Sequence, residues 1–143
     1  METMQVVTFR LNQTNFGVDI LKVREIMRLS AITELPIAAT YMRGVIDVRG
    51  EVIPVVDTRV KLGMVGQEES EESRLLLVEV GEKTIALLVD EVSEVLSIAA
   101  DKISPLSGLE MGLGNTVSIE GVANLEEGFL ILINVESLLL NVG

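Results

Sequence analysis

The chain has 143 residues, a net charge of −11, and no cysteine, histidine or tryptophan. The acidic charge argues against nucleic acid and anionic membranes as partners, because both bind basic patches. Disulfides and thiolate metal sites are excluded, and a chain without cysteine suits a reducing compartment. The usual general base and the usual zinc ligands are also missing, so we expect no catalytic residues, no metal and no cofactor.

The composition is rich in apolar residues, at 48% with a mean hydropathy of +0.47. The longest apolar runs, such as 85–89 and 129–133, are nevertheless far shorter than the roughly 20 residues of a membrane helix. The first residues lack the basic and apolar regions of a signal peptide. We therefore expect a cytoplasmic protein without membrane insertion, whose surplus apolar residues form a core or a protein-binding surface.

Apolar and polar residues alternate over 7–11 and 16–20, which predicts two strands of a hairpin. A second hairpin is predicted over 44–56, where Arg49 and Gly50 form the turn. Pro54 lacks a backbone donor, so its strand should lie at an edge or carry a bulge there. Residues 57–62, followed by Gly63, predict a short helix with a glycine stop.

The second half of the chain repeats this pattern. Residues 16–26 match 85–95, which lie 69 positions later, and 44–57 match 121–134 at an offset of 77. The change of offset indicates an eight-residue insertion, and 108–115 has the composition of a loop. Duplication is our interpretation, with coincidence between apolar segments as the alternative. The repeat predicts a mainly β fold of two small barrels, in which Asn134 caps a last short helix.

Two segments, one acidic and one rich in glycine, are considered as binding sites. The acidic segment 67–73 falls between the copies and is interpreted as a solvated linker, with a binding role as the alternative. The glycines of 108–114 lack the Lys-Ser/Thr ending of a phosphate loop, so a plain loop is favoured.

Two other places are candidates for a binding surface. Residues 23–27 and their counterpart 92–96 each place Val and Glu on one face when extended. They are either buried strands or the walls of an apolar groove for a partner helix. Arg49 matches Glu126 in the second copy, so the turn does not require arginine. It is a solvated tip, a charged contact for a partner, or one half of an ion pair with Glu25.

Residues 16–26, 35–36 and 44–57, with 88–96 in the second half, resemble the CheW family of bacterial chemotaxis coupling proteins. The family usually has Asn-Leu-Arg-Gly where this chain has Asp-Val-Arg-Gly, so Arg49 is retained. The resemblance implies one domain, 1–143, of two packed SH3-like five-stranded β-barrels with short helices. The approximate subdomains are 14–66 and 74–143, and the strand at 5–11 can join the second barrel.

The resemblance also implies a function and partners. Family members are non-enzymatic adaptors that couple the cytoplasmic tips of methyl-accepting chemotaxis receptors to the regulatory domain of the histidine kinase CheA. They are cytoplasmic and recruited to receptor arrays at the inner membrane. Kinase contacts are expected at barrel ends and strand edges, without assigned residues. Carried over by position, the receptor-binding residues are Val23, Glu25, Ile26, Arg49, Val92 and Val95.

Two alternatives remain at this point. The chain could be the coupling domain of a CheV-type protein or of another chemosensory pathway, such as type IV pilus motility. The absence of a receiver-like segment favours a stand-alone adaptor. A small-ligand-binding β-barrel protein is the alternative from a different class, and a convergent pair of carboxylates in a pocket would favour it.

Overall fold

The computed structural model describes residues 2–36, 39–66, 68–104 and 118–140, and it is mainly β with a few short helical turns. The loop expected at 108–115 lies outside the described residues. In chain order the elements are β1 (Thr3–Leu11), β2 (Thr14–Asp19), η1 (Ile20–Lys22), β3 (Val23–Arg28), β4 (Met42–Val48), β5 (Glu51–Asp57), α1 (Thr58–Lys61), β6 (Arg74–Val80), β7 (Lys83–Val89), β8 (Glu91–Ala99), η2 (Ala100–Lys102), β9 (Ile103–Ser104), β10 (Ile119–Leu125), β11 (Gly128–Ile133) and α2 (Val135–Leu138).

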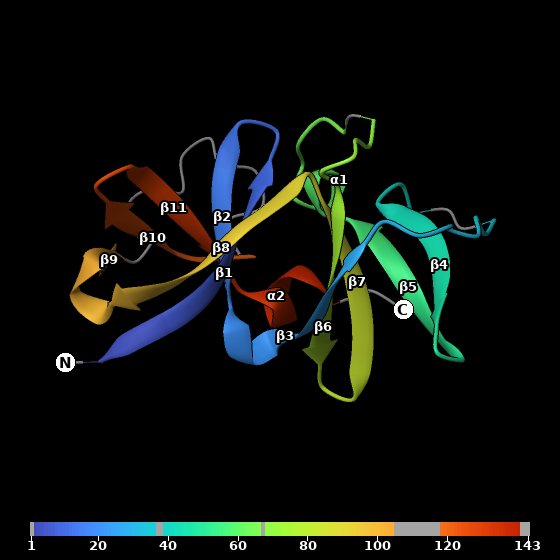
Figure 1. The fold of residues 1–143 in the computed structure, drawn as a ribbon, viewed down its shortest axis with the longest axis horizontal. Helices are drawn as coiled ribbons and strands as arrows, with labels where there is room; N and C mark the ends of the chain where they lie inside the picture. The colour runs from blue at the N-terminus through green and yellow to red at the C-terminus, as the bar shows by residue number, and fades with distance from the viewer. Residues whose placement is uncertain (1, 37–38, 67, 105–117, 141–143) are drawn as a thin grey trace.

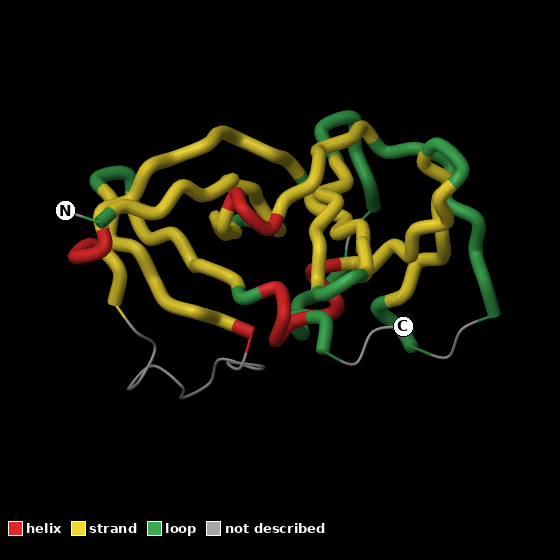
Figure 2. The backbone as a smooth tube through the Cα atoms, turned by 90° about the horizontal axis from the view of Figure 1, so that it is seen from below, coloured by secondary structure: helices red, strands yellow, loops and turns green. Residues whose placement is uncertain are grey.

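The strands form two mixed sheets. The six-stranded sheet has the order β8-β1-β2-β11-β10-β9 and the five-stranded sheet the order β3-β6-β7-β5-β4. The sheets lie side by side, with α1, α2 and η1 close to their junction (Figures 1 and 2). Within the described residues no strand ladder joins the end strands of either sheet, so neither is a closed barrel by its hydrogen bonds. Thr33, beyond β3, nevertheless exchanges two backbone hydrogen bonds with Val45 of β4.

The predicted hairpins, the short helix of 57–62 and the Asn134 cap are confirmed. β1 pairs with β2, β4 with β5, β6 with β7, and β10 with β11, all antiparallel. The Asp57 side chain accepts hydrogen bonds from the first backbone amides of α1. The Asn134 side chain accepts one from Ser137 N at α2. Local turn and cap chemistry therefore determines these elements.

The expectation that Pro54 lies on an edge strand was wrong, and the nearby bulge is in the partner strand β4, between Met42 and Gly44, not at Pro54 itself. β5 is not an edge strand, because β4 and β7 flank it on both sides. The parallel ladder between β5 and β7 covers only Val55 to Asp57 on β5, so Pro54 lies just before its start. A proline is tolerated there because the neighbouring strand no longer requires its missing donor.

The two copies of the repeat have exchanged their first hairpins. By sequence, β1 and β2 correspond to β6 and β7, β3 to β8, β4 to β10, and β5 to β11. β1 and β2 lie in the sheet of β8–β11, whereas β6 and β7 lie in the sheet of β3–β5. The two parallel pairs, β2 with β11 and β7 with β5, both join strands of different copies.

This exchange separates the sheets from the halves of the chain. The expected subdomains 14–66 and 74–143 do not coincide with the sheets. The first contains β2, which lies in the six-stranded sheet, apart from β3–β5. The second contains β6 and β7, which lie in the five-stranded sheet, apart from β8–β11. β1, which contains the strand expected at 5–11, pairs with β8. A half of about 65 residues buries so little surface that it would be only marginally stable alone. The exchange joins both halves around shared cores.

Three apolar clusters fill the molecule. The central cluster lies between the sheets and includes Phe9 and Val18 from one and Leu76 and Leu87 from the other. A second cluster covers the opposite face of the five-stranded sheet, and a third that of the six-stranded sheet. The central strand β7 is buried on both faces, as its continuous apolar sequence predicts.

Gly44 and Gly121, which match in the repeat, sit where another segment approaches closely. A Cβ on Gly44 would lie 2.1 Å from the Thr33 carbonyl oxygen, and one on Gly121 would lie 2.9 Å from that of Ser104. Either side chain would push away the strand segment that packs there. Glycine at both positions is therefore explained by close backbone approach.

A buried ion network connects the sheets where the chain crosses between them. Arg59 of α1 is 1% exposed and donates to Asp57 and, at 2.9 Å, to Asp90. Asp90 lies between β7 and β8, and its other oxygen accepts from Asn12 N in the β1–β2 turn. Burial lowers the pKa of Arg59, but the hydrogen bond to Asp57 and the two carboxylate charges outweigh burial and raise it. The guanidinium thus stays charged and holds the crossing in place.

We predict that Arg59→Met lowers the free energy of unfolding by about 3–5 kcal/mol, because it leaves Asp90 without its counter-charge and Asp57 with only Arg43, at 4.0 Å. Denaturant unfolding followed by circular dichroism measures the loss. The matched control is Lys22→Met, since Lys22 pairs with Glu136 of α2 at the other crossing, where both side chains are exposed. The control should change stability little, and equal losses in the two variants would contradict this role of Arg59.

Candidate functional site: a groove between the two sheets

A bulge in β3 decides which of its side chains face the other sheet. Val23 pairs with Val78, but Glu25 already pairs with Leu77, so Arg24 is an extra residue. Val78 belongs to the central cluster and Leu77 to the cluster on the opposite face. Directly paired residues share a face. Val23 therefore faces the other sheet, whereas Glu25 faces away.

The same bulge places Ile26 beside Val23. Ile26 pairs with Leu76, which belongs to the central cluster. The expectation that Val23 and Glu25 share one face was wrong, because it assumed a regular strand. The bulge shifts the alternation by one residue.

β8 repeats this device in the other sheet. Val92 pairs with Phe9 and Val95 with Val7, so three steps on β8 match two on β1. Phe9 and Val7 both belong to the central cluster. The Thr8 hydroxyl donates to Glu94 O at 3.0 Å and accepts from Glu94 N at 3.1 Å, which satisfies the bulged backbone.

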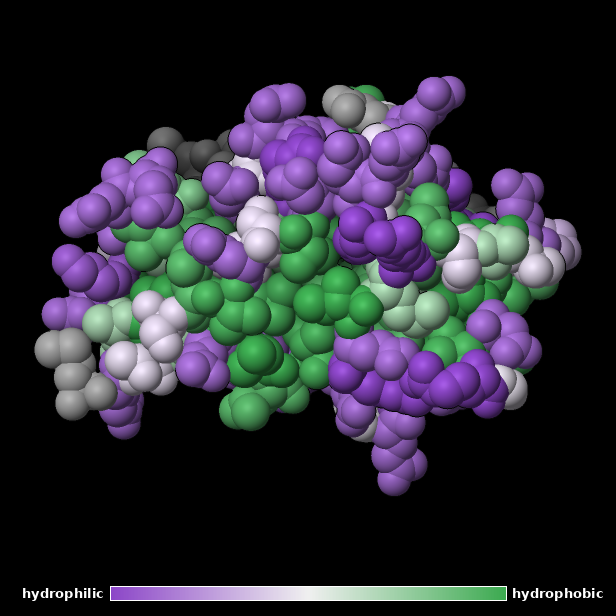
Figure 3. All heavy atoms as spheres, in the orientation of Figure 1, coloured by the Kyte–Doolittle hydropathy of each residue, from purple (hydrophilic) through white to green (hydrophobic). Residues whose placement is uncertain are grey.

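Four of the predicted site residues therefore line the junction of the sheets from two matching edge strands. Val23 and Val92 are partly buried and both pack against the central cluster. Ile26 and Val95, their neighbours on the same faces, are 44% and 52% exposed. Figure 3 shows apolar surface gathered over the middle of this face, where β1, β8 and η1 lie. We call these four residues the groove residues.

Glu25 and Arg49 form the ion pair that the sequence suggested. Arg49 Nη2 lies 2.8 and 3.0 Å from the two carboxylate oxygens of Glu25. Arg49 has φ 51° and Gly50 φ 87°, so the β4–β5 turn uses the left-handed region at both central residues. Such a φ is uncommon for arginine. The pair ties this turn to the bulge of β3, and Arg49 is two-thirds exposed.

A second ion pair beside it was missed. Arg24 Nη1 lies 3.0 Å from Glu51 Oε1 and donates to Thr84 of β7. The sequence contained a signal for this pair. Each of the two segments, Arg24-Glu25 and Arg49-Gly50-Glu51, carries one arginine and one glutamate, so two ion pairs can form between them. Together the two pairs hold the tip of the β4–β5 hairpin against β3.

The interpretation of the acidic segment as a solvated linker was wrong for part of it. Glu69 forms an ion pair with Arg43 of β4, and Ser73 is buried. Asn12 Nδ2 donates to Val65 O just before this segment. These contacts fasten the connection between α1 and β6 to both sheets.

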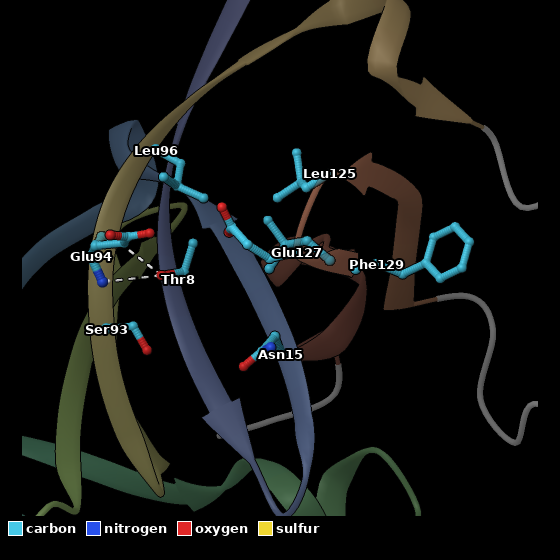
Figure 4. Close-up of a pocket in the computed structure, with 10 residues that line it drawn as sticks. Thr8, Asn15, Ser93, Glu94, Leu96, Leu125, Glu127 and Phe129 are labelled. Atoms are coloured by element: carbon cyan, nitrogen blue, oxygen red, sulfur yellow. Dashed lines mark hydrogen bonds between the residues drawn. The ribbon is translucent and has the colours of Figure 1, made fainter.

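A pocket of about 170 Å³ lies in the six-stranded sheet, between β8 and the β10–β11 hairpin (Figure 4). Glu94 and Glu127 line it together with Thr8 and Leu96, and Phe129 stands at its edge. Ligand pockets usually measure about 300–1,000 Å³. The pocket is smaller than this, and the only hydrogen bonds drawn in it join Thr8 to the backbone of Glu94. It gives little support to the small-ligand alternative.

The described residues contain no group of three or more acidic side chains placed to hold a metal ion. In the same part of the chain, no helix has the length and apolar character required to cross a membrane. A β fold with an apolar surface formed by two matching edge strands, with ion pairs beside it, is typical of a protein-binding scaffold.

Comparison with known proteins agrees with this class. The CheW-like domain family matches residues 5–142, so the chain belongs to this family. It is 33% identical to the chemotaxis protein CheW of Klebsiella aerogenes over 135 residues, covering 94% of this chain and 81% of that protein. It is 31% identical to a probable chemotaxis protein CheW of Rhizobium etli, with coverage of 94% and 86%.

A solved structure gives the same answer for the fold. The scaffolding protein TtCheW from Thermoanaerobacter tengcongensis matches with a TM-score of 0.86 at 30% identity, covering 93% of this chain and 90% of that one. The family resemblance read from the sequence is thereby confirmed. The protein is a chemotaxis scaffold, and the expectation that it is not an enzyme is confirmed with it.

Proposed function

We propose that the protein couples the cytoplasmic tips of methyl-accepting chemotaxis receptors to the regulatory domain of the histidine kinase CheA. The observation that carries this proposal is the groove, where matching residues of two repeat copies, Val23 with Val92 and Ile26 with Val95, face a shared apolar junction. An apolar groove with two similar walls fits an amphipathic helix. Receptor tips supply the helical partner.

In this proposal the receptor-binding surface consists of the four groove residues together with the Glu25–Arg49 pair. Glu25 lies between Val23 and Ile26 in β3 but on the opposite face, and its pairing with Arg49 fixes the tip of the β4–β5 hairpin against this strand. The kinase binds elsewhere, at the exposed strand edges and loops of the sheets. The protein works in the cytoplasm and is recruited to receptor arrays at the inner membrane.

A related assignment is the coupling domain of a longer chemotaxis protein. The chain is 25% identical to the chemotaxis protein CheV3 of Helicobacter pylori over 126 residues, which is 87% of this chain but 40% of that protein. The groove would act in the same way there.

The decisive experiment is reconstitution. The purified chain is mixed with a receptor signalling fragment and the histidine kinase of the same organism, and sedimentation and kinase autophosphorylation are followed. We expect the kinase to sediment with the receptor, and to respond to it, only when the chain is present. Coupling that proceeds equally without the chain would refute the proposal.

The groove is tested by Val92→Asp, which places a charge on the groove wall. We predict at least a tenfold loss of receptor binding, because apolar contact contributes roughly 25 cal/mol per Å² removed from water. Val52→Asp is the matched control, since Val52 is 65% exposed in β5, outside the groove residues. Circular dichroism checks folding, and a Val92→Asp protein that unfolds would assign Val92 to the core instead.

The Glu25–Arg49 pair calls for a double-mutant cycle. Arg49→Ala should barely change stability, because an exposed ion pair contributes about 0–1 kcal/mol, while receptor-dependent kinase activity should fall. Glu25→Arg combined with Arg49→Glu should restore part of the coupling that each reversal loses alone. Strictly additive losses would leave Arg49, at most, as an independent contact.

A further inference from the structure

Two arginines stand directly opposite each other at the end of the β3–β6 pair. Arg28 and Arg74 are Cα partners, the last such pair on these strands. Like charges placed directly opposite destabilise a sheet. The chain has 22 acidic and only 11 basic residues, so a carboxylate would be the commoner neighbour. Arg74 has a structural role, because its guanidinium donates to backbone carbonyls of the turn before β6. Arg28 is the arginine of this pair that needs another explanation.

These arginines lie on the face that forms the groove. Ile26 and Leu76 face the other sheet, and strand side chains alternate, so Arg28 and Arg74, two residues further along, share that face. An open hollow of about 750 Å³ adjoins them, and Leu29, Glu69, Ser70, Glu71 and Ser73 also line it. The apolar wall of β3 thus ends at two arginines, with two glutamates in the same hollow.

The neighbouring charges leave Arg28 available. Arg74 Nη1 is held by the backbone carbonyls of Glu71 and Ser73, each at 2.8 Å, which fixes its guanidinium. Of the two glutamates in the hollow, Glu69 is paired with Arg43. Glu71 is exposed and forms no ion pair within 4 Å among the described residues. Arg28 is exposed, and in the described part of the chain it forms no ion pair within 4 Å.

We propose that the receptor helix in the groove presents a carboxylate to Arg28, with Arg74 beside it, just beyond the apolar side chain that contacts Ile26. The proposal rests on the proposed function of the groove and specifies its partner as apolar and acidic. Arginine binds a carboxylate through paired hydrogen bonds. The basic pair also offsets, locally, the repulsion between an acidic partner and a chain of net charge −11.

The spacing of Ile26 and Arg28 indicates where on the receptor helix the carboxylate should lie. Ile26 and Arg28 are separated by about 7 Å along the strand, from a rise of about 3.3 Å per residue. A helix advances about 5.4 Å per turn. Where the helix follows β3, the acidic residue lies about four positions from the apolar residue at Ile26, since four residues advance about 6 Å and stay on one face of the helix.

The test is charge reversal, measured as binding of a purified receptor signalling fragment at low and at 0.5 M salt. Arg28→Glu should weaken binding about tenfold at low salt and reduce the salt dependence. Lys102→Glu is the matched control, with the same charge change at an exposed residue of η2, and should stay within about twofold. Reversing the predicted receptor carboxylate to arginine should restore binding to Arg28→Glu.

Two outcomes would overturn the proposal: equal effects of Arg28→Glu and Lys102→Glu, or a loss in Arg28→Glu with unchanged salt dependence. The Val92→Asp variant distinguishes a failure of the Arg28 proposal from a failure of the proposed receptor-binding groove. Binding that survives Val92→Asp refutes the groove itself. Binding lost in Val92→Asp but kept in Arg28→Glu refutes only the role of Arg28.

Discussion

The rest of the structure depends on the exchange of hairpins between the two copies of the repeat. Each copy places its first two strands in the sheet completed by the other, so the chain crosses from sheet to sheet at η1 and again at Asp90. The central cluster exists because of this arrangement, since strands of both sheets contribute to it. The crossings also deliver β3 and β8 to the edges of their sheets, where the groove forms.

The ion pairs at the two crossings are similar in position but different in kind. Arg59 and Glu136 occupy matching places in α1 and α2, with opposite charge. The first is buried with two aspartates, and the second meets Lys22 in solvent. A buried pair fixes geometry at a cost in desolvation, whereas an exposed one constrains little. The β7–β8 crossing is therefore the firmly held one.

Much of the fold could be predicted from the sequence where the signal is local. Period-two alternation, the Arg49-Gly50 turn and the caps Asp57 and Asn134 gave hairpins and helices that the structure contains. The exchange of hairpins could not be predicted. The apolar pattern of a hairpin shows which of its faces is buried, but not which of the two sheets the hairpin joins. The bulges also escaped, since one extra residue in β3 or β8 leaves no mark in composition but reverses every later side chain. The positions of the site residues in the sequence were predicted, but the strand faces on which their side chains lie were not.

The exchange also changes what it means to cut this chain. The two copies are joined along the chain by the connection between α1 and β6, and each sheet contains strands from both copies. A break there would leave two fragments whose strands are interleaved, parallel pair by parallel pair, across both sheets. The fragments would separate only by unfolding. In this respect the molecule is an intertwined dimer whose two subunits happen to be joined.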